Sequence, residues 1–155
     1  MITADQWLDE LRTFKGVRFR HQGRGGNGID CIGLVMAAAQ NLGLDKDAHH
    51  KVGGYPHTPD PMQLEGNCDK YMERLPYNRL QALTLQAKKG DVVLFHVEKP
   101  GVPRHVGVYA GRDHQARPCF IHSYAQEDRG VIEQPMTTYW LSRVHALYHV
   151  EGVER

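Results

Sequence analysis

The sequence predicts an α+β domain, with helices in the first half of the chain and an antiparallel sheet in the second. Two observations support this prediction. Apolar residues recur at helical spacing before residue 45, and after residue 90 they alternate with a period of two. No internal repeat interrupts the 155 residues, so we expect one domain over 1–155, with a loop and helix insertion at about 45–75.

Two helices are predicted in the first half, with a glycine-rich run between them. Residues 4–15 place four apolar side chains at helical spacing: Trp7, Leu8, Leu11 and Phe14. Residues 20–29 hold four glycines, which are too many for a regular element. Asp30 is a favourable N-cap for the second helix, which continues to about residue 42 and puts Cys31 at its first position.

The second half reads as strands. Three segments alternate apolar and polar side chains, with a fourth candidate near the end of the chain: 91–97, 105–110, 119–124 and 144–150. Between the helices and these strands, the insertion consists of a loop and a helix from residue 61 to about 74. We expect the insertion to border a cleft, with Tyr55 on its wall.

The composition excludes several classes of protein. Nineteen basic against 18 acidic residues give a net charge of +1, which argues against nucleic-acid binding. No run of about 18 apolar residues or signal-type leader is found, so we expect a protein without membrane insertion that is made in the cytoplasm. Three cysteines with no repeating spacing disfavour a disulfide framework, and ten histidines raise the prospect of acid–base chemistry.

Cys31 is the first candidate for chemistry. A helix N-terminus lowers the pKa of a thiol, since partial positive charge and unpaired N–H groups favour the thiolate. The free N–H of Cys31 could also donate to an oxyanion. The neighbouring Asp30 is a substrate-binding candidate. The alternative is that Cys31 is a small buried side chain with no chemical role.

Two histidines could serve that thiol as a base and its orienting partner. If residue 107 pairs with 122 in the hairpin, His105 and His122 lie on one face of the sheet, together with Tyr109. A single histidine in a strand is more often structural. His96 is a rival base, although its place at a strand end favours a surface group.

Four collinear motifs carry a family resemblance: GIDCIGLV (28–35), GDVVLF (90–95), RHVGVYAG (104–111) and FIHSY (120–124). In this order they resemble the signatures of the NlpC/P60 cysteine peptidases. The stretches FRHQG (19–23) and GVIEQPMTTYW (130–140) resemble the branch of cell-wall peptidases carried in phage tails and related particles. The resemblance covers nearly the whole chain.

The resemblance implies a papain-like fold in which the cysteine helix packs against the sheet. It also implies that Cys31 is the nucleophile, His105 the general base and His122 the residue that orients His105. The substrate would be peptidoglycan, cleaved in its stem peptides between γ-D-glutamate and a diamino acid, without a cofactor. Tail or tail-tip proteins of a phage or prophage would be partners, with the protein held in the particle.

One position departs from the family. Many members have a tyrosine shortly before the cysteine, and Phe19 stands at that place here. His21 or Gln22 could supply the missing polar contact, so these three are substrate-binding candidates. Other functions considered are a tail-assembly module without turnover, a thiol acyltransferase and an interbacterial toxin.

Other histidine, cysteine and aromatic side chains could bind a metal or a ligand. The set His49, His50, His57 and Cys68 matches no zinc spacing, so no metal is predicted. Cys119 is expected to pack in the core. Tyr139 and Trp140 could stack on a sugar, but packing is the more ordinary role.

Overall fold

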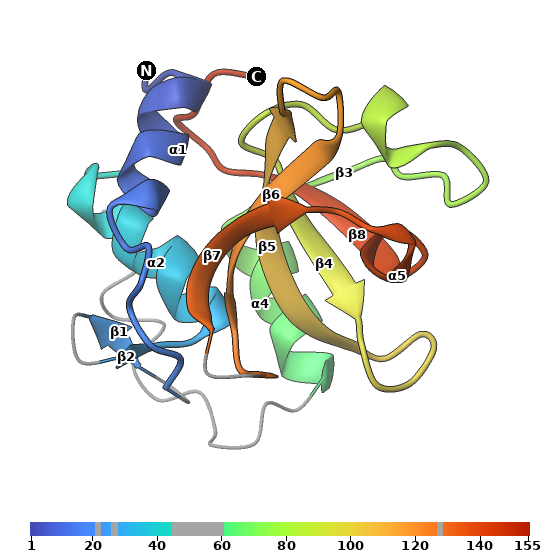
Figure 1. The fold of residues 1–155 in the computed structure, drawn as a ribbon, viewed down its shortest axis with the longest axis horizontal. Helices are drawn as coiled ribbons and strands as arrows, with labels where there is room; N and C mark the ends of the chain where they lie inside the picture. The colour runs from blue at the N-terminus through green and yellow to red at the C-terminus, as the bar shows by residue number, and fades with distance from the viewer. Residues whose placement is uncertain (21–22, 26–27, 45–60, 127–128) are drawn as a thin grey trace.

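The computed structural model describes residues 1–20, 23–25, 28–44, 61–126 and 129–155. In chain order the elements are α1 (Ala4–Arg12), β1 (Arg24–Gly25), β2 (Gly28–Ile29), α2 (Cys31–Asn41), α4 (Pro61–Tyr71), β3 (Glu73–Leu75), η1 (Leu83–Leu85), β4 (Val92–His96), β5 (Pro103–Arg112), β6 (Pro118–Tyr124), β7 (Gly130–Pro135), α5 (Thr138–Leu141) and β8 (Val144–His149). The strands β3 to β8 form one antiparallel sheet in the order β3-β8-β4-β5-β6-β7 (Figure 1). The predicted α+β layout is confirmed.

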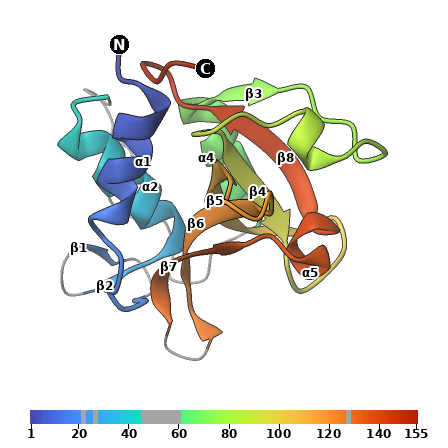
Figure 2. The same cartoon turned by 45° about the horizontal axis from the view of Figure 1, so that its top comes forward.

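Two apolar clusters lie on opposite faces of this sheet. On one face, the alternate side chains Val92 and Leu94 pack with α1, α2 and α4. On the other face, Val93 and Phe95 pack with Trp140 of α5 and with η1. Figure 2 shows α1 and α2 on one side of the strands and α5 on the other. The sheet therefore separates two apolar cores.

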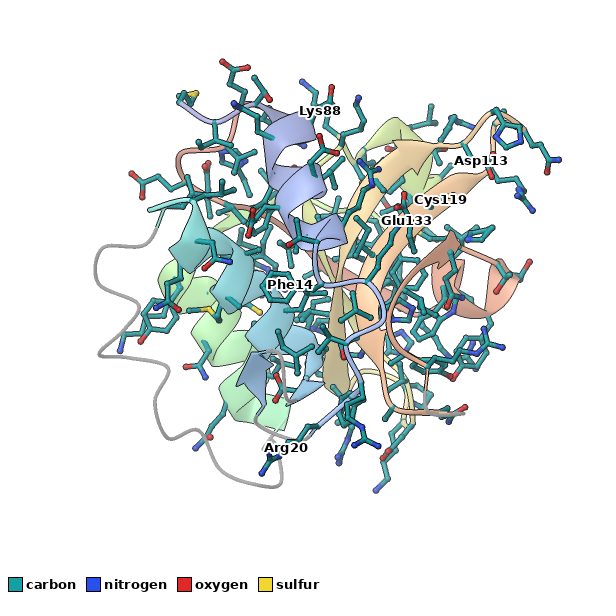
Figure 3. All side chains as sticks on the ribbon, turned by 60° about the vertical axis from the view of Figure 1, so that its left-hand side comes forward. Phe14, Arg20, Lys88, Asp113, Cys119 and Glu133 are labelled. Atoms are coloured by element: carbon teal, nitrogen blue, oxygen red, sulfur yellow. The ribbon has the colours of Figure 1, made fainter. Side chains whose placement is uncertain are left out.

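Helix α1 begins with a capping box. The Thr3 hydroxyl accepts from the Gln6 N–H, and the Gln6 side chain accepts from the Thr3 N–H at 2.9 Å. The helix ends at Arg12 rather than near residue 15, because the chain turns through Gly16, whose φ is +88°. Phe14, labelled in Figure 3, follows the helix and packs against the first cluster.

Helix α2 starts where the sequence predicts it. The Asp30 carboxylate accepts a hydrogen bond of 2.6 Å from the Gly33 N–H, as an N-cap does. The helix interior is buried against the sheet and α1, and Gly43 with φ of +67° follows its end. This packing fixes the position of Cys31, the first residue of α2.

The glycine-rich run is more regular than predicted. Strands β1 and β2 pair antiparallel, so the expectation of no regular element is wrong for these four residues. A Cβ at Gly28, where φ is +142°, would collide with the side chain of Arg20, which is labelled in Figure 3. Glycine is what lets this short ribbon form just before the cysteine helix.

The predicted strands are confirmed, and the six-stranded sheet contains two further strands. Val144–His149 is the fourth predicted strand, and β3 and β7 were not predicted. The helix predicted to reach residue 74 ends at Tyr71, because the residues after it pair with β8 as an edge strand. Within the described residues, no helix is long and apolar enough to cross a membrane.

Candidate active site

Cys31 opens α2 and is half-buried. Two contacts hold the segment just before it. The Ser123 hydroxyl of β6 donates to the Ile29 carbonyl at 2.7 Å, and Asp30 caps the helix. The segment before α2 is therefore tied to β6, the strand that also carries His122.

The thiol of Cys31 is not in an environment that lowers its pKa. Burial raises that pKa to about 12, and the negative charge of Asp30 adds to the effect. Backbone N–H groups, including that of Val106, act in the opposite direction without compensating for the burial. The backbone N–H groups at the start of the helix lower the pKa as predicted, but the expected net lowering is wrong, because desolvation outweighs them. The raised pKa favours the neutral thiol over the thiolate.

His105 and His122 are joined directly. The Nε2 of His105 lies 2.7 Å from the Nδ1 of His122, and both rings are buried. The register that makes this possible is the predicted one, since Val108 pairs with Ile121 and places residue 107 opposite 122. A Cβ at Gly107 would meet His122 and Phe120, so a glycine there leaves the space that the two imidazoles use.

Gln134 of β7 completes this chain. Its Oε1 lies 3.1 Å from the Nε2 of His122. An amide oxygen can only accept, so His122 carries its proton on Nε2 and offers Nδ1 as an acceptor. The Nε2 of His105 must then be the donor between the two rings. His105 is left with a lone pair on Nδ1, which is the nitrogen that a base needs.

Aromatic rings enclose the two histidines. Phe120 stacks on His122 with ring centroids 4.0 Å apart, and Trp140 approaches His105 at 5.4 Å and His122 at 5.1 Å. Burial lowers the pKa of His105 well below its ordinary value, and the nearby His122 adds to this effect. Burial also lowers the pKa of His122 to about 4, against the opposing effect of the Gln134 bond. Both rings are neutral near pH 7, and the expectation that Trp140 packs is confirmed.

A cavity of about 990 Å³ adjoins these groups. Its described lining includes Phe19, Asp30, Cys31, Arg104, His105 and Tyr124. Cys31 and His105 thus line the same cavity. Among the described residues no hydrogen bond joins the Cys31 thiol to either imidazole, so their pairing belongs to the proposal below.

The other predicted residues fall in different places. Phe19 and Asp30 line the cavity, whereas Tyr109 is buried in the second cluster and does not. His96 also lies away from the cavity, where its ring faces His145 at 6.4 Å. Three site candidates lie outside the described residues: His21, Gln22 and Tyr55.

Neither remaining cysteine forms part of a site among the described residues. Cys68 is buried on α4, and Cys119, labelled in Figure 3, is buried on β6 as expected. In the described part of the chain, no group of three or more histidine, cysteine or acidic side chains could hold a metal ion. The segment that carries His49, His50 and His57 lies outside that part.

Gln134 was missed by the sequence reasoning because β7 was missed. Gln134 pairs with Phe120, and this places it on the His122 face of the sheet. Residues 130–135 (GVIEQP) do not alternate apolar and polar side chains, so this segment lacks the usual strand signal.

Comparison with known proteins places the chain in a family. The NlpC/P60 family profile matches residues 16–148. The chain belongs to the NlpC/P60 family. It is similar to the murein DD-endopeptidase MepS/murein LD-carboxypeptidase of Escherichia coli K12, with 29% identity over 138 residues, and equally to that of strain O157:H7. The alignment covers 88% of the chain and 57% of that relative, so the chain spans just over half the relative's length.

A solved NlpC/P60 structure agrees with the fold. The NlpC/p60 domain of the peptidoglycan hydrolase SagA superimposes with a TM-score of 0.58 and 17% identity, over 94% of this chain and 97% of that one. The predicted NlpC/P60 fold, with its cysteine helix packed against an antiparallel sheet, is confirmed.

Proposed function

We propose that this protein is a cysteine peptidase that hydrolyses amide bonds in the stem peptides of peptidoglycan. The observation that carries the proposal is the buried chain His105–His122–Gln134, which leaves the Nδ1 lone pair of His105 beside a cavity that Cys31 also lines. The family and the activity of the murein peptidases that the chain resembles support the same reaction class.

The reaction begins from a neutral thiol and a neutral imidazole. As the Cys31 sulfur bonds to the amide carbonyl carbon, His105 Nδ1 takes the thiol proton. The carbonyl oxygen becomes an oxyanion. The backbone N–H of Cys31, at the start of α2, donates a hydrogen bond to it. Proton transfer during attack, rather than a standing thiolate, is what the raised pKa of the thiol requires.

The second half of the reaction releases both products. The imidazolium of His105 returns its proton to the departing amine as the carbon–nitrogen bond breaks, which leaves a thioester on Cys31. A water molecule, deprotonated by His105, then attacks the thioester carbonyl, and the sulfur leaves with a proton from the same ring. His122 and Gln134 take no proton, because their role is to hold the tautomer of His105.

Two finer features belong to the proposal. The scissile bond is the one between γ-D-glutamate and the diamino acid, and the protein works in a phage or prophage tail. The bond is taken from the family resemblance, and the tail from the likeness of residues 19–23 and 130–140 to phage peptidases.

Mass spectrometry of digested peptidoglycan tests the proposal. Wild-type protein should release stem-peptide fragments whose new termini identify the bond, and Cys31→Ala should release none. Cys119→Ala is the matched control, because it removes a buried thiol on β6 and should keep activity. Full activity in Cys31→Ala would falsify the proposal, and fragments cut at another bond would overturn only the bond assignment.

A further inference from the structure

Arg104 is a cavity residue that the reaction described above does not use. It directly precedes His105 on β5, and both side chains line the cavity. Neighbours in a regular strand face opposite sides of the sheet. Here the register shifts, since Phe95 pairs with His105 but His96 pairs with Pro103, so Arg104 is the extra residue of a bulge. Bulges of this kind re-aim a side chain beside an active site.

The guanidinium of Arg104 is incompletely satisfied. Its Nε is buried and makes no hydrogen bond within the part of the chain that the structure describes. Its ion-pair partner Glu98 stands 3.7 Å away, beyond hydrogen-bond range, on a side chain that is 69% exposed. The Arg104 side chain is 29% exposed and lines the cavity, so it presents a positive charge there. The buried Nε is out of reach of a ligand, and an anion in the cavity would therefore bind to the exposed part of the guanidinium.

The chemistry of the ligand follows from the geometry of a guanidinium. Two parallel N–H donors match a carboxylate, and such paired bonds are among the strongest in proteins. A γ-linked glutamyl residue uses its side-chain carboxyl in the peptide bond and so keeps its α-carboxylate free. That carboxylate is a short aliphatic chain away from the scissile carbonyl, and Arg104 and His105 line the same cavity.

We propose that Arg104 binds the free α-carboxylate of the γ-linked glutamyl residue on the acyl side of the scissile amide. This inference rests on the proposed function and deepens it, because it names the feature of the substrate that the cavity selects. A stem peptide in which that carboxylate is an amide would lose the interaction.

The test uses two synthetic stem peptides that differ only in that group, carboxylate or carboxamide. Wild-type protein should favour the carboxylate peptide by about 10- to 100-fold in kcat/KM, mainly through KM. Arg104→Gln should abolish this preference by weakening the carboxylate peptide alone, and Arg104→Lys should keep part of it, since the charge remains without the paired donors. Arg79→Gln, an exposed arginine outside the cavity, should behave as wild type.

Binding measured without turnover separates this inference from the proposed function. Cys31→Ala and Cys31→Ala/Arg104→Gln are titrated with both peptides by NMR, which also reports whether each variant is folded. A carboxylate preference present only when Arg104 is present supports the inference, even if wild type cleaves neither peptide. Equal binding of the two peptides to Cys31→Ala, or an equal loss for both in the Arg104→Gln and Arg104→Lys variants, overturns it.

Discussion

The Nε2 of His105 lies 2.7 Å from the Nδ1 of His122, and this contact decides which nitrogen of His105 is free for chemistry. The Gln134 oxygen on the far side of His122 fixes the direction of the whole chain. The free Nδ1 lone pair of His105 therefore depends on a residue that does not line the cavity.

Replacing Gln134 should expose this dependence. In Gln134→Leu the Nε2–H of His122 loses its acceptor, and His122 can move its proton to Nδ1, where it would face His105 as a second donor. We expect kcat to fall about 10-fold or more, with little change in KM. Gln134→Glu keeps an acceptor and should retain most of the activity.

Two readouts separate positioning from packing in this pair of variants. Nitrogen chemical shifts of the His122 ring should show an Nε2–H tautomer in wild type and a mixture in Gln134→Leu. The pH–rate profile of Gln134→Glu should move upward, since the added carboxylate favours charged His122. If Gln134→Leu kept wild-type kcat and a single tautomer, Gln134 would have no positioning role.

The parts of the site that the sequence predicted are those set by local signals. Asp30 as an N-cap places Cys31 by chemistry confined to one helical turn, and the alternation of two adjacent strands places His105 and His122 on one face. Gln134 could not be placed in this way, because its role depends on the pairing of β7 with β6.

The raised pKa of Cys31 could not be predicted either, because it depends on contacts between segments that are distant in the sequence. The helix N-terminus is a local feature, and it favours a thiolate. The burial that raises the pKa of Cys31 comes from the sheet and from α4 packing around it, and this packing depends on residues far away in the sequence. In the same way, β3 was missed because its few exposed residues form a strand only against β8.

Alkylation of Cys31 should reflect its raised pKa. With the thiol pKa raised to about 12, its rate of reaction with iodoacetamide should be low at pH 7 and should still rise between pH 8 and pH 10. Peptide mass spectrometry can follow Cys31 separately from Cys68 and Cys119. A rate that reaches a plateau below pH 7 would instead indicate a standing thiolate paired with an imidazolium. Low reactivity at neutral pH therefore does not by itself indicate a protein without turnover.

Asp30 offers a way to change that reactivity without moving the helix. Asparagine caps helices about as well as aspartate, so Asp30→Asn should keep α2 while removing a charge that raises the pKa of the thiol. We expect alkylation of Cys31 at pH 8 to be several-fold faster than in wild type. Asp30→Ala also removes the charge but loses the cap, and thermal unfolding should show a cost of about 1 kcal/mol. An unchanged alkylation rate in Asp30→Asn would contradict the electrostatic role of Asp30.

The buried histidine pair should make the fold sensitive to acid. The pKa of His122 is about 4 in the folded protein and 6.5 in an unfolded chain, so between these values the unfolded state binds more protons. The free energy of unfolding must then fall as the pH drops from about 6.5 toward 4, by roughly 3 kcal/mol from His122 alone. The pKa of His105 is also lowered, which acts in the same direction. Denaturant unfolding at pH 7.5, 6, 5 and 4 measures this slope, and His122→Asn should flatten part of it while remaining folded. A wild-type stability that is constant from pH 7 to pH 4.5 would show that burial does not lower the pKa values of the two rings in the folded state.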